Sequence, residues 1–201
     1  MAIQEQPLIN FIRALEAAAT AATDDLDDKD RRKATAHAVF AELDGAWAKE
    51  SVEPAKLDAC RHLPAALTNA EAGPEPVANL ARAFAALAPA LCWRLRPPDV
   101  GEDPAFRAGH ANADIVGPAG LARHDDIVVG VSLMAPQVIY PNHDHPPEEI
   151  YVVMSEGDWF NEEEGWYTPG VGQVVHHRPS IVHAMRSGTE PLLAVWCLKR
   201  P

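Results

Sequence analysis

A double proline, Pro97-Pro98, separates two halves of the sequence that differ in their pattern of apolar residues. Proline fixes φ and has no backbone N–H, so the pair cannot lie inside a helix and favours an extended connection. Before it, apolar residues recur every three or four positions. After it, short β-rich runs alternate with turns that contain glycine, proline and asparagine. The sequence therefore predicts a helical region over residues 1–96 and a β-barrel domain over residues 97–201.

The first half predicts four helices from the periodicity of its apolar residues. They are expected over residues 5–23, 28–50 and 54–69 and from Gly73-Pro74 onward. Pro89 is expected to kink or end the last helix. Phe40 and Trp47 lie on the apolar stripe of the second helix and are expected to pack in the core. Because polar chemistry does not cluster here, this half is expected to form a helical cap or an oligomerisation surface.

The second half predicts a mainly β fold. Six β-rich runs follow one another at short spacing, over residues 126–134, 137–140, 149–154, 172–177, 181–185 and 192–198. The first and last runs are apolar at both parities, as expected for strands that are covered on both faces. Such spacing is typical of a sandwich or barrel, and a closed two-sheet barrel is expected here. The acidic run 162–164 is expected at a solvated hairpin tip.

Charge and cysteine usage narrow the class of protein. A formal net charge of -12 opposes binding to nucleic acid or to an anionic membrane. The three cysteines are widely spaced and form no CxxC pair, which argues against a disulfide framework or a thiolate zinc site. No run reaches the roughly 18 apolar residues of a membrane span, and no leader pattern opens the sequence. A cytoplasmic protein without membrane attachment is therefore expected.

One stretch concentrates groups that bind metals. His143, His145, Glu149 and Tyr151 all occupy odd positions, and side chains alternate faces along a strand. The two histidines are therefore expected to share one face, and Glu149 and Tyr151 to share a face of the next strand. Pro146-Pro147 cannot continue a central strand and is expected to form the turn that brings the two pairs together. By the same parity, the neighbouring Glu148 is expected to point away.

A third imidazole is expected from His183, which lies among apolar residues of a later run. His176 and His177 are adjacent and face opposite ways, so at most one can approach the site, and both are expected at the surface or behind the ligands. Imidazoles and a carboxylate form a mixed set that suits Zn, Fe(II), Mn, Co or Ni, without choosing among them. Four other histidines have no partner at ligand spacing: His37, His62, His110 and His124.

The order of these residues resembles the paired motifs of the cupin superfamily. The matching residues are His143-x-His145-x3-Glu149, followed by Gly157, Pro179 and His183. Two of the spacings differ by one residue from the usual cupin pattern, but the set of metal ligands is retained. The resemblance implies a double-stranded β-helix barrel with a bound metal. It says little about the reaction, because this fold carries many chemistries.

A second resemblance extends over nearly the whole chain. Tyr140, the run from His143 to Tyr151, His183, the helical first half and the length resemble the Q-type dimethylsulfoniopropionate lyases of marine bacteria. This resemblance implies cleavage of dimethylsulfoniopropionate to dimethyl sulfide and acrylate by a tyrosine-initiated β-elimination. It also implies one divalent transition metal, such as Zn, Fe or Mn.

The same resemblance implies roles for individual residues. The metal ligands would be His145, Glu149 and His183, with His143 in or beside the ligand shell. Tyr151 would be the catalytic tyrosine. Tyr140 would be the second active-site tyrosine, which holds the substrate carboxylate or shares its proton.

The implied substrate is a zwitterion that requires two kinds of recognition. A divalent cation stabilises charge at the carboxylate and favours the phenolate of a nearby tyrosine, whose unperturbed pKa is about 10. Aromatic faces attract the sulfonium by about 0.5–2 kcal/mol. One or two of five aromatic residues are expected to do so: Trp159, Phe160, Trp166, Tyr167 and Trp196. We favour Trp159 and Trp196 as substrate-binding residues, although core packing also accounts for Trp196.

Two alternatives remain open at this stage. A cupin oxygenase or isomerase acting on another small organic acid could use the same ligands, with Fe(II) and dioxygen in the case of the oxygenase. A non-enzymatic cupin that senses or stores a small ligand is less favoured, because such modules often lack a full ligand set. The helical half carries no DNA-reading helix with a basic face, which also weakens a regulatory interpretation. A small-molecule substrate and a possible homo-oligomer are the expected partners.

Overall fold

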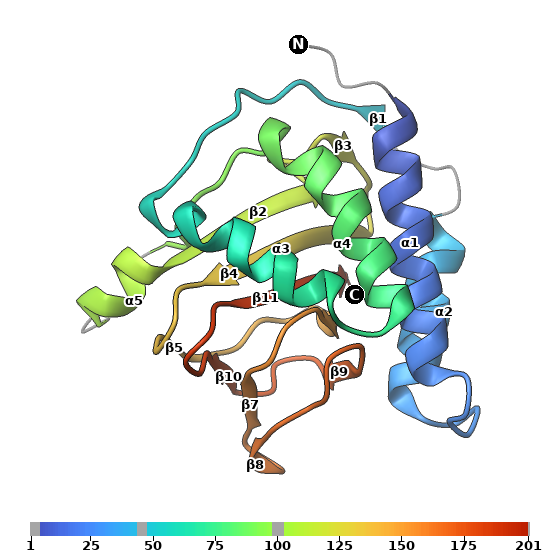
Figure 1. The fold of residues 1–201 in the computed structure, drawn as a ribbon. Coiled ribbons are helices and arrows are strands. Elements are labelled where there is room, and N and C mark those ends of the chain that lie inside the picture. Colours follow the sequence, from blue (N-terminus) through green and yellow to red (C-terminus); the bar gives the residue numbers. More distant parts are fainter. Residues whose placement is uncertain (1–4, 44–47, 98–102, 201) are drawn as a thin grey trace.

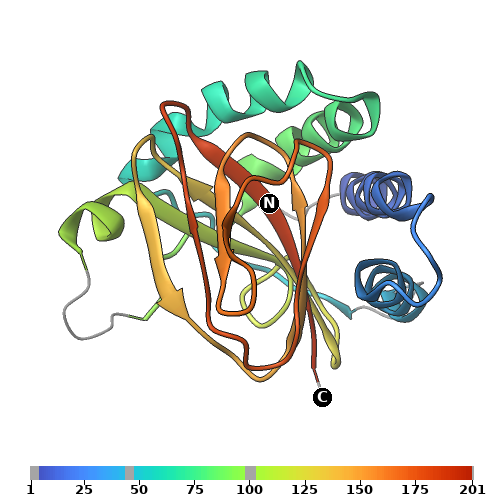
Figure 2. The same cartoon turned by 90° about the horizontal axis from the view of Figure 1, so that it is seen from below.

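The computed structural model describes residues 5–43, 48–97 and 103–200. Two β-sheets face each other, and helices cover the outer face of the larger sheet (Figures 1 and 2). The larger sheet has the strand order β1-β3-β2-β4-β11-β6-β9, and the smaller has the order β5-β10-β7-β8. The predicted mainly β cupin barrel with an N-terminal helical region is confirmed.

The helices are α1 (Glu5–Thr23), α2 (Arg31–Leu43), α3 (Leu63–Glu71), α4 (Glu75–Leu87) and α5 (Pro104–Gly109), with 3-10 turns at Asp58–His62 and Ala88–Ala90. The large sheet contains β1 (Ala48–Lys49), β2 (His110–Val116), β3 (Ala122–Arg123), β4 (Ile127–Met134), β6 (Glu148–Val153), β9 (Val174–His177) and β11 (Leu192–Lys199). The small sheet contains β5 (Ile139–His143), β7 (Asp158–Asn161), β8 (Gly165–Tyr167) and β10 (His183–Arg186).

The four predicted helices are present, but the predicted bounds of two are wrong. The second helix ends at Leu43, and residues 48–49 form β1 instead. The third begins at Leu63, after a 3-10 turn, and not near residue 54. The prediction for Pro89 is confirmed, because α4 ends at Leu87 and a 3-10 turn contains the proline. Phe40 is buried as expected. Trp47 lies outside the described residues. The helix pair α1 and α4 packs through aromatic rings, with the centroids of Phe11 and Phe84 6.0 Å apart.

The apolar side chains form two clusters, one on each face of the large sheet. Along β4, Val129 and Val131 pack with the helices, whereas Val128 and Met134 belong to the barrel interior. Strand β11 alternates in the same way. This double coverage is why both strands are apolar at both parities. The barrel interior therefore receives every second side chain of β4 and β11, and there the site is built.

The six predicted β-rich runs all contain strands, and the acidic run forms the hairpin tip between β7 and β8. Five strands lie outside the predicted runs: β1, β2, β3, β7 and β8. The longest of them, β2, was missed because its sequence His110-Ala-Asn-Ala-Asp-Ile-Val is poor in β-branched and aromatic residues. It is nevertheless buried along its whole length and pairs with β4. Tertiary pairing here outweighs a weak local preference.

The division at residue 96 and the oligomerisation surface stay predictions. One apolar cluster joins side chains from both sides of that boundary, such as Phe84 and Val131. Strand β1 from the first half also pairs with β3 of the large sheet. Within the described residues, no helix has the length and apolar character needed to span a membrane.

Candidate metal centre

The two sheets each bring one pair of directly opposed residues to the barrel interior. On the small sheet, His143 of β5 is the cross-strand neighbour of His183 of β10. On the large sheet, Glu149 of β6 is the neighbour of His177 of β9. The pairs meet across the interior, because His183 Nε2 lies 3.3 Å from Glu149 Oε2. Three imidazoles and a carboxylate thus come together from four strands.

Pro146-Pro147 forms the bend between β5 and β6, as predicted, and this bend carries the chain from one sheet to the other. His145 lies in the same connection, where its Nε2 is 3.2 Å from Glu149 Oε2. Glu149 and Tyr151 are both buried and point into the barrel. Glu148 points away and bonds His176 on the outside, with a distance of 2.7 Å to its Nε2. The parity prediction is confirmed for both glutamates.

The three predicted histidine ligands share one local hydrogen-bond pattern. The Nδ1 of each lies 2.9–3.0 Å from a backbone carbonyl two residues away, which belongs to Pro141 for His143, Pro147 for His145 and Ile181 for His183. An Nδ1–H that donates to a carbonyl leaves the lone pair on Nε2. Second-shell bonds of this kind fix the tautomer and ring orientation of metal-binding histidines. Each ring is therefore set to present Nε2 as a ligand atom.

Glu149 is the electrostatic centre of the group. Burial opposes its ionisation, but the hydrogen bond with His145 and the nearby imidazoles of His177 and His183 outweigh burial and hold its pKa well below the usual value. The pKa of His145 is raised, because the bond and charge of Glu149 outweigh its own burial. The pKa of His143 falls to about 3, through burial and then the charge of His183. The group is thus an ionised carboxylate among imidazoles, of which His177 and His183 are almost fully buried.

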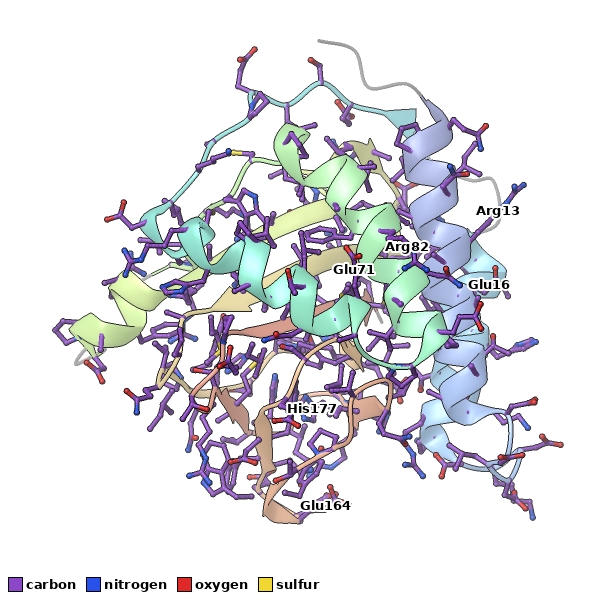
Figure 3. All side chains as sticks on the ribbon, in the orientation of Figure 1. Arg13, Glu16, Glu71, Arg82, Glu164 and His177 are labelled. Atoms are coloured by element: carbon purple, nitrogen blue, oxygen red, sulfur yellow. The ribbon has the colours of Figure 1, made fainter. Side chains whose placement is uncertain are left out.

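His177 is the site residue that the sequence reasoning missed. Its side chain is 1% exposed, and its Nδ1 lies 3.6 Å from Glu149 Oε2. Figure 3 shows it among the strands of the barrel, whereas Glu164 lies at the barrel's edge. The prediction that at most one of the two adjacent histidines approaches the site is correct. Pairing of His177 with Glu149 in the β6–β9 register decides which one, and the sequence does not reveal that register.

The arrangement fits a metal ion. Two groups have ligand atoms within 4.8 Å of one another, His143 with His145 and His183, and Glu149 with His177 and His183. Both ring nitrogens of His177 and the Nε2 of His183 are buried without a hydrogen-bond partner. His183 Nε2 is near Glu149 Oε2 but without hydrogen-bond geometry. Buried nitrogens left unsatisfied cost about 1–3 kcal/mol each, and coordination would remove that cost for a ligand atom.

The two predicted tyrosines line the same interior. The ring of Tyr140 lies 4.7 Å from that of His143, and Asn112 Nδ2 donates to its hydroxyl at 3.2 Å. The ring of Tyr151 lies 5.8 Å from that of His177. Burial, followed by the charge of Glu149, raises the pKa of Tyr151 well above its ordinary value. Tyr151 is therefore a neutral phenol unless a cation is bound close to it.

The aromatic candidates fall into two groups, one inside the barrel and one outside it. Trp159 and Trp196 are buried in the same interior cluster as both tyrosines. Trp196 is the cross-strand neighbour of Tyr151, and the ring of Trp159 lies 6.3 Å from that of Tyr151. Trp166, by contrast, is 42% exposed and already carries the guanidinium of Arg186 at 4.5 Å from its ring centroid. Phe160 packs beside Trp166, with centroids 5.5 Å apart.

The omitted histidines have other contacts or lie elsewhere. His110 stacks on Phe106 at 3.8 Å between centroids, and its Nδ1 lies 2.7 Å from the Phe106 carbonyl. His124 Nε2 contacts the carbonyl of Glu42 at 3.2 Å. His62 is close to Arg61, and His37 lines a groove between α1 and α2. None of these four histidines belongs to a group of potential metal ligands in the described part of the chain.

The chain is similar in sequence to known proteins. Residues 31–194 match the family model described as dimethylsulfoniopropionate lyase. A candidate dimethylsulfoniopropionate lyase, DddL, of Cereibacter sphaeroides is 29% identical over 127 residues, which are 63% of this chain and 52% of that protein. The chain thus spans about half of that relative. Dimethylsulfoniopropionate lyase DddQ of Ruegeria pomeroyi is 29% identical over 151 residues, 73% of this chain and 74% of that protein.

The crystal structure of DMSP lyase DddQ from Ruegeria pomeroyi DSS-3 shares the fold. Its TM-score is 0.73 at 22% identity, over 98% of this chain and 92% of that chain. At this identity the likeness establishes the architecture, including the helical first half, and leaves the roles of single residues to be argued from the site itself.

Proposed function

Because the chain belongs to the dimethylsulfoniopropionate lyase family, we propose that it cleaves dimethylsulfoniopropionate to dimethyl sulfide and acrylate with a bound divalent metal. The observation that carries this proposal is the position of Tyr151, two residues after Glu149 on the same face of β6 and inside the barrel. A proton acceptor beside a carboxylate-binding metal is what this elimination requires.

We assign the metal to His145, Glu149 and His183, with His143 and His177 beside them. The set contains imidazole and carboxylate, which suits Zn, Fe or Mn. When bound, the ion supplies a Lewis acid that withdraws electron density from the substrate carboxylate and favours the phenolate of Tyr151. The buried, unpartnered nitrogens of His177 and His183 support this assignment.

Tyr151 is assigned as the base. Its phenolate oxygen takes the proton from the carbon next to the substrate carboxylate. The electron pair of that C–H bond forms the new C=C bond, and the pair of the C–S bond leaves on sulfur. The products are acrylate and neutral dimethyl sulfide, and Tyr151 returns to its phenol form. Burial of Tyr151 and its neighbours keeps water from this proton transfer.

The two ends of the substrate are assigned to different walls. Tyr140 is assigned to donate its hydroxyl hydrogen to the carboxylate, next to His143. Trp196 and Trp159 flank Tyr151 and offer aromatic faces to the sulfonium, an attraction of about 0.5–2 kcal/mol. Trp196 also packs against Gly130, so it serves the core as well.

A headspace gas assay on metal-analysed protein tests the proposal. The expected result is release of dimethyl sulfide and acrylate in equal amounts, loss of release after chelation, and recovery when Zn, Fe(II) or Mn is added back. Release should be the same with and without dioxygen, because an elimination consumes none. Strict dependence on dioxygen, or no release by any metal-loaded form, would overturn it.

A further inference from the structure

A buried chain of polar side chains ends on the hydroxyl of Tyr140. Ser132 of β4 and Asn112 of β2 are cross-strand neighbours. Ser132 Oγ donates to Asn112 Oδ1 at 2.9 Å, and Asn112 Nδ2 donates to the Tyr140 hydroxyl oxygen at 3.2 Å. The exposed fractions of Ser132, Asn112 and Tyr140 are 2%, 7% and 5%. Solvent therefore cannot substitute for any member of the chain.

The hydrogen bonds of this series are all donated in one direction, from Ser132 toward Tyr140. An amide oxygen only accepts, so the bond from Ser132 to Asn112 Oδ1 holds the amide with its NH₂ group toward Tyr140. A phenol oxygen that accepts from this NH₂ group still has its own proton, which must point to another side of the oxygen. Three rings surround that tyrosine: Phe106 at 4.6 Å, His110 at 5.6 Å and His143 at 4.7 Å between centroids. Of these three rings, His143 belongs to the metal centre.

A cation also lies beside the ring of Tyr140. The guanidinium carbon of Arg96 lies 5.3 Å from the ring centroids of both Tyr140 and Phe106. A positive charge there repels the hydroxyl proton and attracts an anionic group of a ligand. The charge of Arg96 therefore favours a carboxylate close to the Tyr140 hydroxyl.

We propose that Asn112 and Ser132 are positioning residues that direct the hydroxyl proton of Tyr140 toward the metal centre, where Tyr140 donates it to the substrate carboxylate. The inference rests on the proposed function for the identity of that substrate. Neither residue touches the substrate in this scheme, and their effect passes through Tyr140. Ser132 acts on Tyr140 only through Asn112, so its effect on the Tyr140 hydroxyl is the smaller of the two.

Tyrosine labelled with ¹³C at Cζ reads the hydrogen bonds of Tyr140 without any substrate. The chain has three tyrosines, and Tyr140→Phe identifies the signal of Tyr140 by its disappearance. Asn112→Leu and Ser132→Ala are expected to move that signal and to leave those of Tyr151 and Tyr167 in place. Ser155→Ala is the matched control, since Ser155 is also 2% exposed and bonds the backbone at Pro191 and Leu193.

Acrylate affinity of the metal-loaded protein, measured by calorimetry, tests the second step. Tyr140→Phe is expected to weaken acrylate binding about 10- to 100-fold, and Asn112→Leu about 3- to 10-fold. In the Tyr140→Phe background, Asn112→Leu should weaken acrylate binding no further, because Asn112 acts through the Tyr140 hydroxyl and that hydroxyl is absent. The KM for dimethylsulfoniopropionate should rise with acrylate Kd in the same order, while metal content stays unchanged.

Three outcomes would overturn the inference. The first is a Tyr140 signal that is the same in Ser132→Ala and Ser155→Ala as in the unmodified protein. The second is an equal loss of acrylate affinity from Asn112→Leu with and without Tyr140→Phe. The third is metal-loaded protein that does not bind acrylate. The proposed function fails separately, through a missing release of dimethyl sulfide, and neither the labelled tyrosines nor acrylate binding depends on turnover.

Discussion

Glu149 and His177 are cross-strand neighbours inside the barrel, with His177 Nδ1 3.6 Å from Glu149 Oε2. An imidazole at this place can donate to the carboxylate and hold it toward the other histidines. Loss of such a contact typically costs 10- to 100-fold in metal affinity. We therefore expect His177→Leu to weaken metal binding by about 10- to 100-fold, measured by competition with a chromophoric chelator.

The adjacent histidine provides the control for that experiment. His176 differs by one position, faces outward and bonds Glu148 at 2.7 Å. His176→Leu should leave metal affinity unchanged. Equal effects of the two substitutions, or no effect of His177→Leu, would contradict a role for His177 at the metal.

Replacement of Tyr151 by phenylalanine should abolish release of dimethyl sulfide while metal content is retained. The substitution removes one buried oxygen and keeps the ring that packs near Trp159 and His177. Trp166→Phe is the control, because Trp166 is 42% exposed and lies outside the interior cluster. Gas release by headspace chromatography and metal analysis are the two measurements. Normal turnover in Tyr151→Phe would exclude it as the base.

Metal occupancy should fall on acidification through the histidine range. A ligand whose pKa is raised is protonated first, and that ligand is His145, where the bond and charge of Glu149 outweigh burial. His143, with a pKa of about 3, stays neutral well below this range. Dialysis at decreasing pH followed by metal analysis checks whether metal is lost where His145 becomes protonated. Circular dichroism on the same samples follows the fold. Full occupancy at about pH 4 would contradict the histidine assignment.

The proposed contact between the Trp196 ring and the substrate sulfonium can be tested by comparing a charged ligand with an uncharged one. Trp196→Leu should weaken binding of dimethylsulfoniopropionate by about 2- to 30-fold, since a cation–π contact contributes about 0.5–2 kcal/mol. Binding of 4-methylpentanoate, which has the same shape without the charge, should change much less. Trp166→Leu on the exposed side of the small sheet is the control. An equal loss for both ligands would assign Trp196 to packing alone.

Gly130 holds the space that the ring of Trp196 occupies. A Cβ at this position would overlap two ring carbons of Trp196 and would lie 2.7 Å from the carbonyl oxygen of Ala113. We expect Gly130→Ala to lower the free energy of unfolding by about 1–3 kcal/mol and to raise KM by displacing the ring. Gly188→Ala, where a Cβ meets nothing within 4 Å, should have little effect in the same thermal melts.

Much of the fold could be predicted from periodicity. Helix α1 and the strands β4 and β11 follow directly from apolar spacing, because burial on one or both faces requires it. Strand β2 could not be predicted in this way. Its residues have weak β preference, and pairing with both β4 and β3, together with the packing of its apolar side chains in the helix-side cluster, stabilises it as a strand.

The sequence by itself determined which groups of the motif face the barrel. Strand parity placed Glu149 and Tyr151 on one side and Glu148 on the other, because side chains alternate with a period of two. Parity does not predict the register between neighbouring strands, because the register depends on how the whole sheet packs. The β6–β9 register brought His177 to Glu149, and the β2–β4 register placed Ser132 and Asn112 behind Tyr140. These residues lie in separate segments of the chain, so only the tertiary structure decided that they lie beside the predicted site residues.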